Sequence, residues 1–278
     1  MMTLKPSKIK NIVIFALLVA FALFFIMPVY FTIINSFKPL REIVTSYTSI
    51  PKTFYLGNYI KAWIKTDYPR VFLNSLIITI ASVSGIVLVS SMAGYILART
   101  PGKLSWFIFV IIVFSMIIPF HSIMIPLIIV IKKLHLSNSI PGIIIVYWGI
   151  GCNFAIFLYH GFVKTIPKEL EEAAAIDGCS RFQIFFKVVF PLLAPVTSTI
   201  VVLDTLWIWN DFLLPLLVLQ KRAIKTIPLS QYVFVGQYYS EWGLALAGLT
   251  LAVIPVVLFY VFMQKYIVKG ITTGAIKG

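Results

Sequence analysis

The residues of this sequence that could do chemistry are few. Of its 278 residues, 9 are Asp or Glu and 3 are His. No G-x-x-x-x-G-K-[ST] pattern is present, so the backbone cradle and the lysine that bind nucleotide phosphates are missing. Neither an H-E-x-x-H pattern nor a paired Cys/His spacing is present either. The sequence therefore predicts no catalytic residue, no metal site and no cofactor bound by this chain.

The polar segment 165–191 has a composition that is typical of two short helices joined at a glycine. Gly178 can adopt the left-handed conformation that ends a helix. Ser180 and Gln183 have the S-x-x-Q spacing of a capping box, which starts a second helix. Glutamates that favour a helix N-terminus and strongly helix-forming alanines precede the glycine: Glu169, Glu171, Glu172, Ala173, Ala174 and Ala175. The segment is equally consistent with a spacer at a membrane surface and with a docking surface.

Two carboxylates, Asp204 and Asp211, interrupt an otherwise uncharged stretch, 188–220. They are seven residues apart, which places them near one face of a continuous helix. An unpaired carboxylate costs about 2.5–3.5 kcal/mol at the centre of a membrane, so both should face a protein interior, a water-filled cavity or a partner. Aromatic and amide side chains nearby suit a hydroxyl-rich solute, and we take as candidate pathway residues Tyr147, Trp207, Trp209, Asn210 and Asp211. Alternatively, Asn210 and Asp211 form local hydrogen bonds near Pro215 or contact a partner subunit.

The composition excludes a soluble enzyme. Hydrophobic residues make up 60% of the chain and charged residues 12%, against about 45–50% and about 25% in soluble domains. The mean hydropathy of +0.99 also excludes a disordered chain. The net charge of +14 would suggest nucleic acid in a soluble protein. Here the excess of cations indicates loops beside anionic lipid headgroups.

Six long runs are free, or nearly free, of charged residues. They cover residues 11–37, 71–98, 104–131, 134–163, 188–220 and 242–264. A helix needs about 20 apolar residues to cross the hydrocarbon core, and each run is longer. Barrel strands would be about 10 residues long and alternate in polarity. The sequence therefore predicts six transmembrane helices, the first of them a retained anchor rather than a cleaved signal peptide.

The charges do not orient this topology. An even number of spans places both termini on one side of the membrane. The side that carries the termini has twelve Lys and Arg residues and the other side has eleven, so the positive-inside rule favours neither orientation.

The spacing of the polar segment resembles the EAA loop of ABC importer permeases. That pattern is EAA, three residues, Gly, nine residues and I-x-L-P. Here Glu172-Ala173-Ala174 is followed at the same spacing by Gly178 and by Val188-x-Phe190-Pro191. Three more stretches resemble the sugar-type, maltose-like branch of this family: M-A-G-Y-I-L-A-R at 92–99, W-N-D-F at 209–212 and the tail at 270–278.

The resemblance implies an all-α membrane protein with the type I ABC importer permease fold and a cytoplasmic coupling-helix loop. Its implied division is an N-terminal tail, first helix and external loop (1–70), a core permease domain of five helices (71–265) and a cytoplasmic tail (266–278). The residues implied to contact the ATPase are Glu172, Ala173, Ala174, Gly178 and Pro191. In the tail they are Gly274, Lys277 and Gly278.

The function implied by the resemblance is that of a permease subunit of an ATP-driven importer. Such a subunit forms half of a translocation pathway, here for a sugar or oligosaccharide, and has no enzyme activity of its own. Its implied partners are a second homologous permease, two ATPase subunits that hold ATP and Mg, and an extracytoplasmic solute-binding protein. Its implied location is a bacterial-type inner membrane, with both termini cytoplasmic.

A self-sufficient secondary transporter or channel is the main alternative. That class shows inverted repeats and charge relays inside the membrane. The sequence shows no clear internal repeat and two carboxylates within the runs. An intramembrane enzyme would need a nucleophile–base pair or a metal site, and no such pattern is present.

Overall fold

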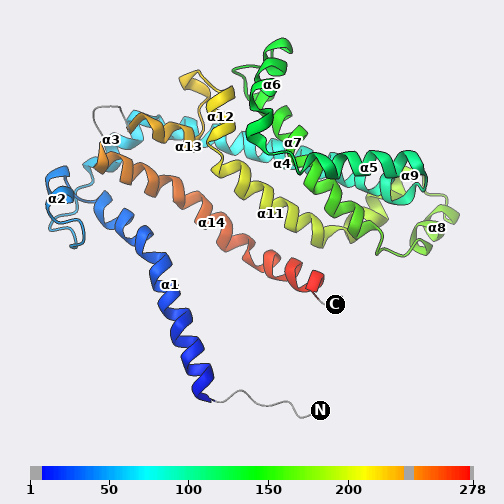
Figure 1. Ribbon diagram of the computed structural model, residues 1–278, viewed down its shortest axis with the longest axis horizontal. Coiled ribbons are helices and arrows are strands. Elements are labelled where there is room, and N and C mark those ends of the chain that lie inside the picture. The colour runs from blue at the N-terminus through cyan, green and yellow to red at the C-terminus, as the bar shows by residue number, and fades with distance from the viewer. Residues whose placement is uncertain (1–7, 235–240, 276–278) are drawn as a thin grey trace. The chain divides into compact units, whose positions relative to one another are not determined.

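The computed structural model describes residues 8–234 and 241–275, and these residues form helices, turns and loops without a β-strand (Figure 1). The chain packs as two compact units. Unit 1 comprises Met1–Tyr68 and Gln231–Ile254, and unit 2 comprises Pro69–Ser230 and Pro255–Gly278.

Unit 1 is built around a small core and a long apolar helix. Ala62, Phe234 and Ala247 are fully buried against one another. The side chains of residues 10–30 are exposed, which suits a helix surrounded by lipid. The elements of unit 1 are α1 (Lys8–Ser36), α2 (Leu40–Thr45), α3 (Gly57–Thr66), a 3₁₀ turn (Gln231–Phe234) and the first part of α14 (Trp242–Ala275).

A buried lysine holds the loop that follows α1. The Lys38 ammonium group donates to the side-chain oxygen of Asn35 at 3.0 Å and to the carbonyl oxygen of Ser46 at 2.8 Å. The Asn58 amide group donates to the carbonyl oxygens of Ser36 at 2.9 Å and Lys38 at 2.8 Å. Because these buried polar groups are hydrogen-bonded, the lysine can be buried and the loop is tied to α3.

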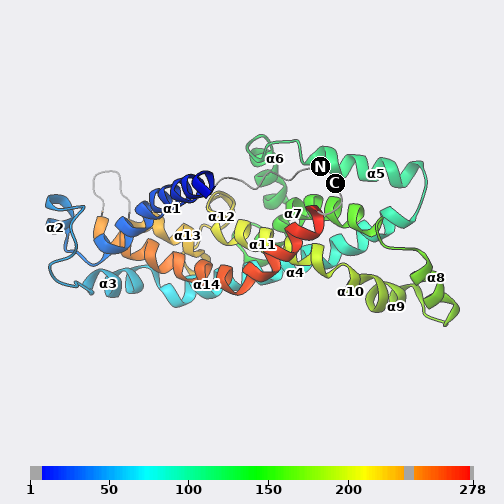
Figure 2. The same cartoon turned by 90° about the horizontal axis from the view of Figure 1, so that it is seen from below.

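Unit 2 contains the main hydrophobic core. In Figures 1 and 2, α4, α7 and α11 run side by side through it. Tyr147, Tyr159, Ile86, Leu193 and Ile200 are among its fully buried side chains. Its helices are α4 (Tyr68–Arg99, from Pro69), α5 (Lys103–Ser115), α6 (Phe120–Lys133), α7 (Ile140–Val163), α8 (Glu169–Ile176), α9 (Arg181–Gln183), α10 (Phe190–Leu192), α11 (Ala194–Asn210), α12 (Leu213–Val218) and α13 (Ile227–Ser230).

Glycines allow α4 to approach α7 closely. A Cβ atom added at Gly94 would lie 2.7 Å from the Cβ atom of Tyr159. A Cβ atom at Gly85 would lie 2.2 Å from the Trp148 ring, whose Nε1 donates to the carbonyl oxygen of Ala81 at 3.2 Å. Small residues therefore set the distance between these two helices, as is common in membrane bundles.

Among the described residues, four helices are long and apolar enough to cross a membrane, and the number rises to six if two bent helix pairs each count as one span. The four cover Lys10–Ser36, Tyr68–Arg99, Ile140–Val163 and Trp242–Gln264. The first bent pair, α5 and α6, replaces the single helix predicted over 104–131 and is bent by 106°. The break ends at Pro119, which has no N–H to donate and disfavours a helical residue before it.

The predicted fifth span is also divided. Residues 181–192 and α11 are bent by 74°, and α11 ends at Asn210. Asp211 has the extended torsions φ −68° and ψ 128°. Pro215 explains this end, because a proline ring clashes with the carbonyl group four residues earlier in a helix. The prediction that Asp204 and Asp211 lie on one face of a continuous helix is therefore wrong.

Candidate functional site

The polar segment folds as a helix, a glycine turn and a second helix start. Gly178 has a φ of 82°, in the left-handed region. Its N–H donates to the carbonyl oxygen of Ala175 at 3.1 Å, and the Cys179 N–H donates to that of Ala174 at 3.0 Å. These two bonds form a Schellman motif that ends α8. The predicted helix stop at Gly178 is confirmed.

The capping box at the start of α9 is also present. The Ser180 N–H donates to Gln183 Oε1 at 2.8 Å, and the Gln183 N–H donates to Ser180 Oγ at 3.4 Å. A π-helix, Ile184–Val189, continues from α9 into α10, and Pro191 is the second residue of α10. The turn around Gly178 and the start of span five are therefore one continuous, hydrogen-bonded piece of structure.

Glu171 ties α8 to the end of α4, and we call its contacts the Arg99–Glu171 latch. Arg99 Nε donates to Glu171 Oε1 at 2.7 Å, and the Tyr95 hydroxyl group donates to Glu171 Oε2 at 2.6 Å. Arg99 Nη2 also donates to the carbonyl oxygen of Ile166 at 2.8 Å. The Arg99 and Glu171 side chains are 13% and 14% exposed, so water screens their charges little. In both ribbon views α8 lies at the end of unit 2 where α4 ends (Figures 1 and 2).

The outer face of this segment is apolar and exposed. Ile176 is 87% exposed and Phe182 is 67% exposed, so both apolar side chains are largely accessible on this short segment. Ala173 is exposed, whereas Ala174 packs against the core of unit 2. Glu172 is exposed beside them. The segment thus presents small and apolar side chains with charged side chains beside them, including Glu172 and Asp177, on a backbone that the latch holds in place.

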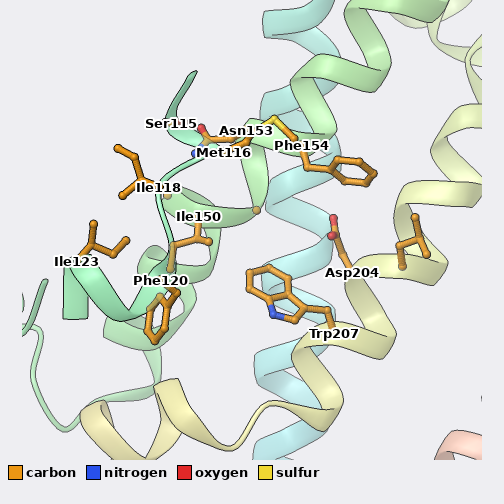
Figure 3. Close-up of a pocket in the computed structure, with 13 residues that line it drawn as sticks. Ser115, Met116, Ile118, Phe120, Ile123, Ile150, Asn153, Phe154, Asp204 and Trp207 are labelled. Carbon is orange, nitrogen blue, oxygen red and sulfur yellow. The ribbon is translucent and has the colours of Figure 1, made fainter. Parts of the chain in front are cut away.

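A cavity of about 540 Å³ lies in unit 2 between the break that separates α5 from α6, the middle of α7 and the middle of α11. Most of its lining is apolar, and the exceptions include Ser115, Asn153 and Asp204, with the ring of Trp207 beside them. Figure 3 shows the Asp204 carboxyl group pointing into the space between the rings of Phe154 and Trp207. Asp204 is 5% exposed, and its Oδ2 atom has no hydrogen-bond partner among the described residues.

Asp211 is used in local structure. The Tyr147 hydroxyl group donates to Asp211 Oδ2 at 2.9 Å. Asp211 Oδ1 accepts from the N–H groups of Leu213 at 3.0 Å and Leu214 at 3.4 Å, so this carboxylate caps the start of α12. The geometry agrees with the alternative of local hydrogen bonds near Pro215.

The other candidate pathway residues are spread over α11. The Trp207 ring meets Tyr147 edge-on, with centroids 5.5 Å apart, and it lines the cavity. The Trp209 ring meets Phe72 at 5.9 Å, and the Asn210 amide group donates to the carbonyl oxygen of Leu206 at 2.7 Å. Of the five predicted pathway residues, Trp207 alone is among those that line this cavity.

Sequence reasoning missed the partners of α8. Tyr95 and Arg99 are four residues apart and so share one face at the end of α4. The predicted topology places three glutamates in a segment on the same side of the membrane as this end of α4. That arrangement could have indicated an ion pair. It did not indicate which glutamate is paired.

The predicted tail contacts lie at the limit of the structure. Gly274 is in the last turns of α14, while Lys277 and Gly278 lie outside the described residues. The division of the chain at residues 70 and 265 stays a prediction. Among the residues that the structure describes, no group of three or more His, Cys, Asp or Glu side chains could hold a metal ion.

Comparison with known proteins gives consistent matches over most of the chain. The family model described as "Binding-protein-dependent transport system inner membrane component" matches residues 87–273. The probable starch degradation products transport system permease protein AmyC of Thermoanaerobacterium thermosulfurigenes is 44% identical over 259 residues, which are 93% of this chain and 94% of that protein. The multiple sugar-binding transport system permease protein MsmG of Streptococcus mutans is 34% identical over 98% of this chain and 99% of its own length.

Two further matches agree with these. The melibiose/raffinose/stachyose import permease protein MelC of Bacillus subtilis is 32% identical and covers 99% of both chains. A crystal structure of a bacterial ABC transporter involved in the import of the acidic polysaccharide alginate contains a chain with a TM-score of 0.82 and 24% identity. The match covers 95% of this chain and 99% of that chain. At this identity the structural likeness shows the fold, which is that of an ABC importer permease.

Proposed function

This chain belongs to the family of binding-protein-dependent transport system inner membrane components, and on that premise we propose that the solute it carries is an oligosaccharide. The chain is a membrane permease of the ABC importer class. Support for the solute class comes from the names of its relatives. These names mention starch degradation products, multiple sugars, and melibiose, raffinose and stachyose.

We infer that the segment from α8 to α10 is the surface on which a partner ATPase docks. The observation that carries this inference is an exposed apolar face on a segment that is locked to the transmembrane helices. Ile176 is 87% exposed, yet the Arg99–Glu171 latch joins its helix to α4, and the π-helix joins it to α11. A movement imposed on α8 would therefore reach both helices as a rigid-body movement. The residues proposed to make this contact are Glu172, Ala173, Ala174, Gly178 and Pro191.

The energy would come from the partners. We propose two ATPase subunits that hold ATP and Mg, a second homologous permease and an extracytoplasmic solute-binding protein. With an ATPase on the α8 side, both termini and residues 164–187 would be cytoplasmic, and residues 38–70 and 220–241 would be external. Gly274, Lys277 and Gly278 would then lie on the ATPase side.

For the solute path we propose the side of unit 2 formed by α7 and α11. Trp207 offers a ring face to a solute there. The Tyr147–Asp211 hydrogen bond would keep the path in shape, because it holds the end of α11 against α7. Trp209 and Asn210 are proposed to line the path further along α11.

Reconstitution in liposomes tests this function. The chain is reconstituted with its cognate permease, ATPase and binding protein. The liposomes should take up labelled maltotriose or raffinose only when ATP is present on the side of the membrane where the ATPase subunits lie. Omission of the binding protein is the matched control and should abolish uptake. Gradient-driven uptake by this chain alone, without ATP, would show a self-sufficient transporter and overturn the proposal.

A further inference from the structure

We infer that the cavity between the α5–α6 break, α7 and α11 is a solute-binding subsite within this subunit, in which Asp204 accepts hydrogen bonds from sugar hydroxyl groups. This inference rests on the proposed function, since it assigns the place where that solute is held. It adds that this subunit contacts the solute itself.

The state of Asp204 is the first argument. Asp204 is 5% exposed, and its side chain points into the cavity (Figure 3). Oδ2 has no partner among the described residues, although a buried polar atom left unsatisfied costs about 1–3 kcal/mol. Asp211, which lies on the same stretch of chain, has three hydrogen bonds to its own surroundings. A carboxyl group that is buried, points into a cavity and has one oxygen without a partner among the described residues is poised to bind a donor that arrives from outside.

The groups around Asp204 select the kind of donor. Trp207, which is 39% exposed, contributes an aromatic ring, and Asn153 and Ser115 contribute an amide and a hydroxyl group. A ring face with a few neutral hydrogen-bonding groups and one acceptor suits a hydroxylated ring. A hard cation would need several oxygen ligands, and Asp204 is the single acidic side chain in the lining.

The backbone geometry provides the space. Because α5 and α6 diverge by 106°, the residues between them, such as Met116 and Ile118, form a wall at a distance from α7. On α7 the lining includes Gly149, and a Cβ atom added there would meet no atom within 4 Å. The resulting volume of about 540 Å³ lies within the range of about 300–1,000 Å³ that is common for small-molecule sites.

The first test changes the acceptor. In the reconstituted importer, Asp204→Asn keeps one acceptor oxygen, whereas Asp204→Leu removes both and leaves an apolar side chain that suits a membrane interior. We expect Asp204→Leu to raise the KM for oligosaccharide uptake about tenfold, the equivalent of one lost hydrogen bond. Asp204→Asn should have a smaller effect. An unchanged KM in Asp204→Leu, with normal assembly, would overturn the inference.

The second test fills the cavity without touching Asp204. Gly149→Leu places an isobutyl group in open space, and Gly161→Leu is the matched control, because Gly161 is also on α7, meets no atom within 4 Å of an added Cβ and lies outside the cavity lining. Gly149→Leu should raise the KM at least tenfold while Gly161→Leu leaves it unchanged. Equal effects of the two variants on the KM would contradict a binding cavity. This result can be read even if the Asp204→Leu importer fails to assemble.

The outcomes separate this inference from the proposed function. If the wild-type importer takes up no oligosaccharide, the proposed function fails. If wild-type uptake is normal and the Asp204 and Gly149 variants behave like wild type, only the subsite is wrong. If uptake requires Na⁺ and Asp204→Asn removes that requirement without changing the KM for sugar, the cavity holds a cation and the inference is overturned.

Discussion

Glu171→Gln tests whether the Arg99–Glu171 latch holds α8 on the transmembrane helices. The substitution keeps the shape of the side chain but removes its charge. Glu171 accepts hydrogen bonds from Arg99 and Tyr95 on its two carboxylate oxygens, whereas an amide has one acceptor oxygen and no charge. Arg99 then donates to a neutral oxygen, and the Tyr95 hydroxyl group loses its carboxylate acceptor. Hydrogen bonds to charged groups contribute about 1.5–3 kcal/mol and neutral ones about 0.5–1.5 kcal/mol, so the loss is about 1 kcal/mol for each contact and about 2 kcal/mol in all. Exposures of 13% and 14% leave little room for screening by water.

A loss of about 2 kcal/mol corresponds to an increase of about 30-fold in the ratio of detached to seated α8. Hydrogen exchange measures this ratio directly, because amides that are protected by a local structure exchange when it opens. The amides of α8 (Glu169–Ile176) should therefore exchange about 30-fold faster in Glu171→Gln than in wild type. The amides of α7, which lies in the core, should be unaffected.

The matched control is Glu169→Gln, which removes an exposed carboxylate from the same helix. It should change α8 exchange by less than about twofold, since surface charges contribute about 0–1 kcal/mol. The reasoning is refuted if the two variants accelerate α8 exchange equally, or if Glu171→Gln leaves it at the wild-type rate.

Three further changes test other parts of the structure. Gly178→Asn should keep ATP-coupled uptake and Gly178→Pro should abolish it, because a φ of 82° is accessible to asparagine but not to proline; loss of both activities to the same extent would contradict this. Gly94→Leu should lower the melting temperature of the purified chain, since its Cβ atom alone would lie 2.7 Å from Tyr159 and overpacking costs about 1–3 kcal/mol; an unchanged melting temperature would show that α4 and α7 are further apart. Asp211→Ala should destabilise the chain by about 1–3 kcal/mol in thermal unfolding, more than Tyr147→Phe, because it leaves several donors unpaired; the reverse order would exclude the capping role.

The sequence predicted the features that depend on neighbouring residues. The helix stop at Gly178 and the capping box at Ser180 each need only residues within one turn, so their spacing was sufficient evidence. The charge-free runs 11–37 and 71–98 likewise match α1 (Lys8–Ser36) and α4 (Tyr68–Arg99) to within three residues at each end, because the hydrocarbon core imposes their length.

The sequence did not predict the features that depend on distant contacts. Arg99 and Glu171 are 72 residues apart, and nothing in the pattern of α8 selects Glu171 over Glu172. The bend of 106° between α5 and α6 was not predicted, although Pro119 disfavours a helical residue before it. The sequence favoured Asp211 over Asp204 as the carboxylate of the pathway. Pro215 was the local signal that the helix ends before Asp211, and only the fold shows that Asp204 faces a cavity.

Photo-crosslinking from Ala173 tests the central claim most directly. Ala173→Cys, with Cys152→Ser and Cys179→Ser, carries a photoreactive maleimide in the assembled importer while it transports. The account predicts a crosslinked product of this chain and the ATPase subunit, because the exposed face of α8 docks there. A transport-competent assembly in which Ala173 crosslinks only to lipid or to the external binding protein would contradict it.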